Sequence, residues 1–60
     1  MNRPYFCAAF LKPLCGRLVA EVVVETDDGA IVRRVAKTRA AAVAALPASV
    51  DRARMPKDWT

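Results

Sequence analysis

The sequence predicts a small α+β fold: an antiparallel β-meander of two or three strands, with one short helix at about residues 39–46 packed on one face. Three observations predict it. β-branched residues are concentrated in segments 17–25 and 30–37, a turn-forming tetrapeptide separates these segments, and an alanine-rich segment follows them. A chain of 60 residues buries only about 60% of the surface that its unfolded form exposes. We therefore expect residues 1–60 to form a single small domain, with 55–60 as a C-terminal tail.

Residues 5–11, Tyr-Phe-Cys-Ala-Ala-Phe-Leu, are the first expected element. Their aromatic residues and their length favour a β-strand, while the two central alanines leave a short helix open as the alternative. Pro13 and Gly16 predict a turn or loop over 12–16. A helix at 5–11 would leave only a two-stranded hairpin, which would need a partner for its stability.

The hairpin at 17–37 is the clearest signal in the chain. Strands are expected over 17–25 and 30–37, and Thr26-Asp27-Asp28-Gly29 supplies the turn between them. Aspartate tolerates turn geometry, and glycine adopts the positive φ that tight turns require.

The register of this hairpin is open between two alternatives. A two-residue type I′ loop at Asp28-Gly29 would place Glu25 opposite Val32, with Ile31 and Val35 on the mainly apolar face of the preceding strand. A type I turn with a bulge at Gly29 would shift the second strand by one residue and exchange its faces. We favour the first register because it separates apolar from charged side chains better.

The helix over 39–46 has recognisable ends. Thr38 can accept a hydrogen bond from a backbone N–H of the first turn, alanines follow it, and Pro47 disfavours helix at the residue before it. A second short helical turn is expected over 50–54, with Ser49 as its cap. Trp59, in the tail, would either fold back over a thin core or anchor a partner.

Basic residues form the main candidate site. The chain has a formal charge of +4, and arginine accounts for seven of its ten cationic residues. Arginine binds phosphates and carboxylates through two parallel hydrogen bonds, which suits nucleic acid or an acidic protein surface. The alternative is a solvated face that neighbouring acidic residues neutralise. The candidate binding residues are Arg17, Arg33, Arg34, Lys37, Arg39 and Trp59.

The composition argues against catalysis. The chain has no histidine, so the commonest general base and zinc ligand is missing. Cys7 and Cys15 match no metal-binding spacing, and whether they are free or paired is left open. Asp27 and Asp28 are explained by the turn that they occupy. We expect no enzyme, cofactor, metal or small-molecule substrate, and no membrane partner, because no apolar segment approaches the roughly 20 residues of a membrane span. A cytoplasmic location is expected.

The expected function is therefore non-enzymatic binding. One helix covers one face of a sheet, so valines on the second face would be exposed unless a partner or a second copy covers them. We expect a small protein that docks on a larger protein or nucleoprotein, or self-associates, as an inhibitor or accessory factor from a phage or other mobile element. The alternative is a sheet-based nucleic-acid-binding module that uses Arg33, Arg34, Lys37 and Arg39. The order strand–strand–strand–helix resembles the arm-binding module of phage integrases and, equally, small phage-encoded inhibitors; the resemblance is topological and carries no motif residue.

Overall fold

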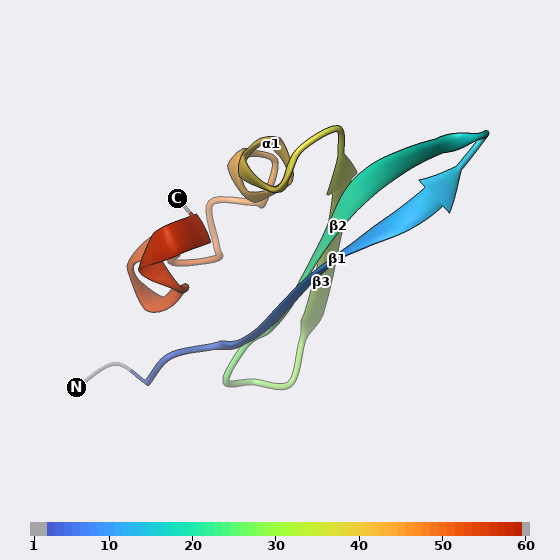
Figure 1. Ribbon diagram of the computed structural model, residues 1–60. Helices are drawn as coiled ribbons and strands as arrows, with labels where there is room; N and C mark the ends of the chain where they lie inside the picture. Colours follow the sequence, from blue (N-terminus) through green and yellow to red (C-terminus); the bar gives the residue numbers. More distant parts are fainter. Residues whose placement is uncertain (1–2, 60) are drawn as a thin grey trace.

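The described part of the chain contains, in order, three strands, one α-helix and two short 3-10 helices (Figure 1). The computed structural model describes residues 3–59, and in it the strands form one antiparallel sheet in the order β1-β2-β3. This arrangement confirms the α+β fold class. The elements are β1 (Phe6–Leu14), β2 (Arg17–Glu25), β3 (Ile31–Ala36), α1 (Arg39–Ala44), η1 (Arg52–Arg54) and η2 (Lys57–Trp59).

The first hairpin is longer than the sequence indicated. β1 is a strand, but it continues to Leu14, so the loop expected over 12–16 is wrong. The turn consists of Cys15 and Gly16 alone, whose φ angles of 50° and 77° are those of a type I′ turn. Pro13 fits because β1 pairs only with β2, and the alternation of the ladder points the backbone of this residue away from β2. Proline therefore removes no hydrogen bond from the sheet.

The second hairpin adopts the register of a type I turn with a left-handed glycine. Glu25 lies opposite Ile31, not Val32, so the favoured register is wrong by one residue. The amide of Gly29 donates to the carbonyl of Thr26 at 2.9 Å, and Gly29 has a φ of 84°. These features define a three-residue loop made of a type I turn and a left-handed glycine. The shift exchanges the faces of β3.

The short helices have caps that can be traced to single side chains. The Thr38 hydroxyl accepts the amide of Ala41 at 3.1 Å, which confirms the expected N-cap. α1 ends at Ala44, two residues before the expected 46. η1 is capped by Asp51, whose carboxylate accepts the amide of Ala53 at 3.0 Å, so the expectation of Ser49 as the cap is wrong.

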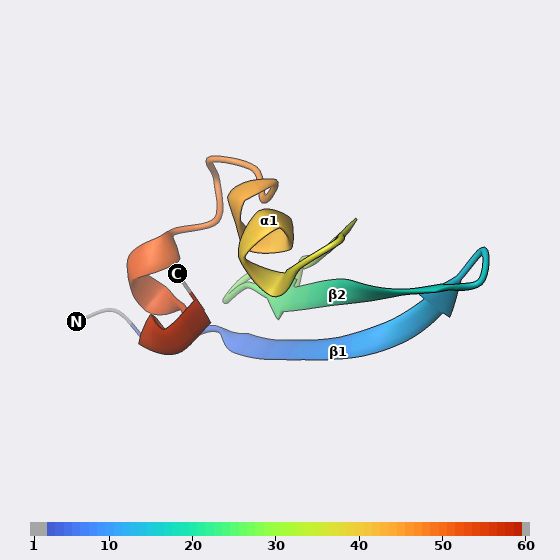
Figure 2. The ribbon, with the colours of Figure 1, turned by 45° about the horizontal axis from the view of Figure 1, so that its top comes forward.

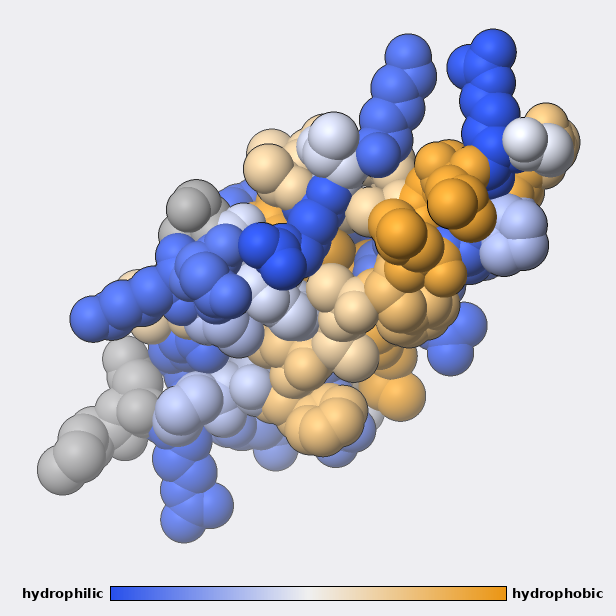
Figure 3. Space-filling model, in the orientation of Figure 1, coloured by the Kyte–Doolittle hydropathy of each residue, from blue (hydrophilic) through white to orange (hydrophobic). Residues whose placement is uncertain are grey.

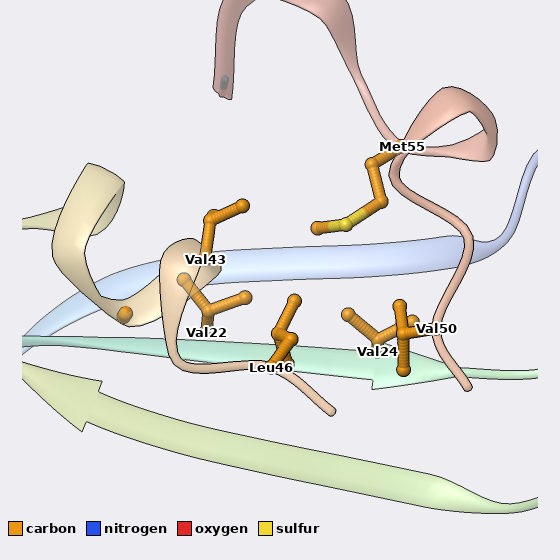
Figure 4. Packing of buried hydrophobic residues seen from close by; sticks show 7 residues of the cluster. Val22, Val24, Val43, Leu46, Val50 and Met55 are labelled. Carbon is orange, nitrogen blue, oxygen red and sulfur yellow. The ribbon is translucent and has the colours of Figure 1, made fainter. Parts of the chain in front are cut away.

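The core lies on one side of the sheet. Figure 2 shows α1 and the C-terminal segment on the same face of the sheet, and Figure 4 shows valines of β2 pointing toward side chains from both. Met55, within the segment expected to be a tail, is 5% exposed and belongs to this core, and Trp59 packs against it. The buried cluster consists of Val22, Val24, Ala42, Val43, Leu46, Val50 and Met55.

The β1–β2 hairpin projects beyond the rest of the sheet. β3 ends at Ala36, opposite Ala20, while β1 and β2 continue to their turn at Cys15-Gly16. We call residues 11–19, which start level with Ala20 and continue beyond the end of β3, the arm. The accessible surface is 4366 Å², about 500 Å² more than the roughly 3,800 Å² typical of a compact 6.5 kDa chain. The arm explains this excess, since it is exposed on both faces; Leu11 and Leu18 are each 66% exposed.

The turn at Cys15-Gly16 predicts a simple gain in stability. Cys15→Asn should raise the free energy of unfolding by about 0.5–1 kcal/mol, because asparagine tolerates the left-handed conformation better than cysteine does. Urea unfolding measures the change.

Gly16→Ala is the opposing control. A Cβ at Gly16 would meet no atom within 4 Å, so its cost of about 1 kcal/mol is purely conformational. A type I′ turn is contradicted if Cys15→Asn destabilises the protein as much as Gly16→Ala does.

Candidate interaction surface

The face of the sheet opposite α1 is the candidate site, and we call it the open face. Strand alternation and the observed registers decide which side chains it carries. Figure 2 shows no described element on this side of the sheet. The open face consists of Phe6, Ala8, Phe10, Lys12 and Leu14 of β1, Arg17, Val19, Glu21, Val23 and Glu25 of β2, and Ile31, Arg33 and Val35 of β3.

Large apolar side chains are exposed on the open face. Phe6 is 72% exposed, Ile31 59%, Phe10 47% and Val35 41%. They come from the two outer strands, β1 and β3. Figure 3, which looks at the molecule from the β1 side, shows apolar side chains along the strands toward the arm, with charged side chains projecting around them. Several large apolar side chains exposed on one face of a sheet make this face a candidate interaction site.

Charges of both signs lie among these apolar groups. The Glu21 side chain is one-tenth exposed because Phe10 and Val35 flank it on the neighbouring strands. Its Oε1 forms an ion pair with the Lys12 Nζ at 3.7 Å. Glu25 and Arg33 occupy neighbouring strands of the same face and have no ion-pair partner within residues 3–59. The open face is therefore mainly apolar, with acidic and basic side chains among the apolar ones, and it does not form a continuous basic surface.

The predicted basic group is divided between the two faces. Arg33 projects from the open face, whereas Arg34 projects from the covered face and is half-buried. The Arg34 guanidinium donates to the carbonyl of Ala45 at 3.1 Å and to that of Arg33 at 2.6 Å. Arg34 thus fastens the end of α1 to the sheet.

Two further candidates are engaged with each other. The Arg39 guanidinium lies 5.7 Å from the centre of the Trp59 ring and donates to the carbonyl of Asp58 at 2.8 Å. This contact and the packing of Trp59 on the core hold η2 against α1. α1 and the C-terminal segment together cover one face of the sheet, and we call them the cover. Arg39 and Trp59 therefore stabilise the cover.

Arg17 and Lys37 are brought together at the arm. Both line a shallow hollow beside Leu14, Leu18 and Val19. Arg33 is different, because it pairs with Val23 of β2. Val23 lies six residues along the strand from Arg17, so about 20 Å separates Arg33 from Arg17. The six candidate residues thus form no single surface.

Sequence reasoning missed the roles of two arginines. Arg52 donates to the carbonyls of Val43, Ala44 and Leu46 at 2.9–3.2 Å, which are acceptors at and after the end of α1. Arg54 lies 4.1 Å from the centre of the Tyr5 ring. No sequence motif predicts these contacts, because they depend on how the C-terminal segment packs against the helix and the N-terminal residues.

The two aspartates of the second turn, Asp27 and Asp28, also make contacts that hold the fold together. The Arg54 guanidinium forms an ion pair with Asp27. The Thr26 hydroxyl donates to Asp28, and this hydrogen bond, with that from the Ala30 amide, holds the pKa of Asp28 below its ordinary value. Both carboxylates serve the loop that sets the register of β3.

Both cysteines are free thiols. Cys7 lies near the start of β1 and Cys15 in the turn beyond its end, so about 20 Å or more of extended strand separates them. A disulfide requires Cα atoms less than about 7 Å apart, so the two cannot pair within one chain. Burial raises the pKa of the Cys7 thiol, while Cys15 is exposed.

Comparison with known proteins finds no relative. No family model, curated protein or solved structure matches the chain. Among the described residues, no helix is long and apolar enough to cross a membrane.

The division of the basic group predicts unequal effects of two neighbouring substitutions. Arg34→Ala should lower the free energy of unfolding by about 1 kcal/mol, because it removes two hydrogen bonds to carbonyls. Arg33→Ala should change it by less than about 0.5 kcal/mol, since the Arg33 side chain makes no such bond. Chemical denaturation distinguishes the two, and equal effects would contradict the assignment.

The thiols are expected to react at different rates. With Cys7→Ser and Cys15→Ser single variants, a thiol reagent at pH 8 should label Cys15 several-fold faster than Cys7. Cys7 has a raised pKa and is half-buried, so less of it is thiolate and less is accessible. In urea the two rates should converge; a difference that persists in the unfolded chains would have another cause.

Proposed function

We propose that this protein is a non-enzymatic interaction protein that docks its open face on a larger partner protein. The observation that carries the proposal is the bare side of the three-stranded sheet, on which two phenylalanines, an isoleucine and a valine are exposed. An inhibitor or accessory factor acts in this way, by occupying a surface instead of performing chemistry.

The apolar content of the open face supports a protein partner. A phenylalanine buries about 150–250 Å² when it is fully covered, so Phe6 and Phe10 offer most of the contact area. Aromatic residues are enriched at protein interfaces, where a few large side chains account for most of the affinity. Burial of the open face would also remove apolar groups from water at roughly 25 cal/mol per Å².

The charges on the open face indicate the chemistry of the partner. Glu25 and Arg33 carry opposite charges and lie beside Ile31. A polyanion would be repelled by Glu25. A partner protein with an apolar patch beside one acidic and one basic side chain would instead form ion pairs with Arg33 and Glu25. Such binding should depend only weakly on salt, in contrast to binding of phosphates.

Nucleic-acid binding is the second candidate function. The feature that favours it is the position of Arg17 and Lys37 on one hollow of the arm. It would use the arm and Arg33, since Arg34 and Arg39 already donate to backbone carbonyls. Binding of labelled duplex that falls steeply with salt would support this function over the first.

The test compares two substitutions of equal size. Ile31→Gln changes the open face, and Leu18→Gln changes a similarly exposed leucine whose side chain lies on the opposite face of the sheet. Ile31→Gln should weaken binding to the protein that the immobilised wild-type chain captures by about tenfold, because a side chain at an interface contributes on the order of 1–2 kcal/mol. Leu18→Gln should bind as the wild type does.

The capture is done after nuclease treatment, and affinity is measured by titration with the purified partner. Equal binding by both variants would contradict docking through the open face. Loss of capture after nuclease treatment would identify nucleic acid as the bound species, and recovery of this chain alone would also contradict the proposal.

A further inference from the structure

The outer edge of β1 carries unpaired backbone groups whose positions follow from the turn. A two-residue turn makes Leu14 and Arg17 a hydrogen-bonded pair, and such pairs alternate along the strands. The backbone N–H and C=O groups of Cys7, Ala9 and Leu11 therefore point away from β2. No other strand pairs with this edge in the described chain.

Both ends of this free edge are closed. The amide of Tyr5, the preceding outward position, donates to the carbonyl of Arg54 at 3.1 Å. Pro13, the following outward position, has no N–H. The free donors are thus confined to three positions with Ala9 at their centre. From Phe6 to Leu11 the strand has no charged residue, so it lacks the usual protection of an edge strand.

The opposite edge of the sheet, on β3, is protected. Its outward positions are Ile31, Arg33 and Val35. The Arg34 guanidinium donates to the carbonyl of Arg33 at 2.6 Å and occupies the middle of this edge. Arg33 also places a charge there, which would repel the same residue of a second copy. Within residues 3–59, the β1 edge is therefore the one that is open to another strand.

We propose that the β1 edge pairs with the β1 edge of a second copy, antiparallel, with Ala9 on the two-fold axis. In this register Ala9 lies opposite the partner's Ala9, and Cys7 lies opposite the partner's Leu11. Each such pair exchanges two hydrogen bonds. Tyr5 lies opposite the partner's Pro13, so the closed ends of the two edges coincide.

This symmetry argues for a second copy over an unrelated strand. The free positions are symmetric about Ala9, which is what a self-complementary contact requires and what a foreign strand does not. Side-chain size is also complementary: Phe10 lies beside the partner's Ala8, and Leu11, which is 66% exposed, lies beside the partner's Cys7. The contact consumes the edge of each copy, so the assembly closes as a dimer. It is independent of what the open face binds.

The first experiment measures mass in solution by sedimentation equilibrium over roughly micromolar to millimolar chain concentration. The wild type should shift from 6.5 kDa toward twice this mass as concentration rises. Ala9→Pro removes an outward N–H that the monomer does not use, as Pro13 already does, and should give a folded monomer. Pro13→Ala, the matched control, restores an N–H at the end of the edge and should still dimerise.

The second experiment tests the register by oxidation in a Cys7→Ser, Cys15→Ser background. Ala9→Cys should form a disulfide-linked dimer, because Cα atoms of a hydrogen-bonded pair lie about 5.5 Å apart. Phe6→Cys should not, since it would face the partner's Lys12, about 20 Å from its own equivalent. If Ala9→Pro fails to fold, this comparison decides the question.

A wild type that stays at 6.5 kDa at every concentration would overturn the proposal. A dimer that persists in folded Ala9→Pro, or cross-links equally well from positions 6 and 9, would also overturn it. A β1 edge occupied by a strand from another protein, seen as a mixed assembly in place of the dimer, would do the same.

Discussion

The packing of Val22 and Val24 beneath α1 and the C-terminal segment is the interaction on which the rest of the structure depends. The cover provides four bulky apolar side chains, from Val43, Leu46, Val50 and Met55, and its remaining buried residue is an alanine. This amount of apolar surface covers one face of a three-stranded sheet and no more. A sheet with apolar side chains on both faces then leaves one face in water, and the exposed apolar side chains of the open face follow from this shortage.

The cover is fastened mainly by arginines. α1 has six residues, so most of its carbonyls have no intrahelical partner. Arg34 and Arg52 donate to carbonyls at and just beyond the end of α1, Arg39 to that of Asp58, and Arg54 to that of Arg3. Four of the seven arginines therefore bond to backbone. The arginine-rich composition, which in the sequence suggests phosphate binding, serves the attachment of a short helix and an irregular C-terminal segment.

The sequence predicts the fold class and the three strands because these depend on local preferences. β-branched residues, the turn at 26–29 and the cap at Thr38 each act within a few residues. The register was not predictable with the same certainty, since a type I turn with a left-handed glycine and a type I′ turn both suit Asp28-Gly29. That single residue of shift moves Ile31 and Val35 from the expected apolar face to the open face, so two of the four large apolar side chains that carry the proposal depended on it.

Other features could not be read locally at all. Pro13 predicts a loop unless it is known that β1 is an edge strand and that this residue faces outward. Met55 enters the core only because the segment after η1 crosses the sheet near Val24, which is a property of tertiary packing. The positions of Arg52 and Arg54 share this cause.

The free edge of β1 bears on the small area of the open face. The part of the sheet that all three strands share is six residues long, the length of β3, and with strands about 4.8 Å apart it presents roughly 14 by 20 Å, or about 300 Å². This area is small beside the roughly 800 Å² per partner of a standard interface. Pairing at the β1 edge would join two open faces into one of six strands and double this area. It would also place Phe6 and Phe10 of both copies near the middle of the joined face, with Arg33 at its outer borders. Aromatic residues at the centre and charges at the rim are the arrangement that protein interfaces favour, and it arises only when β1 is internal.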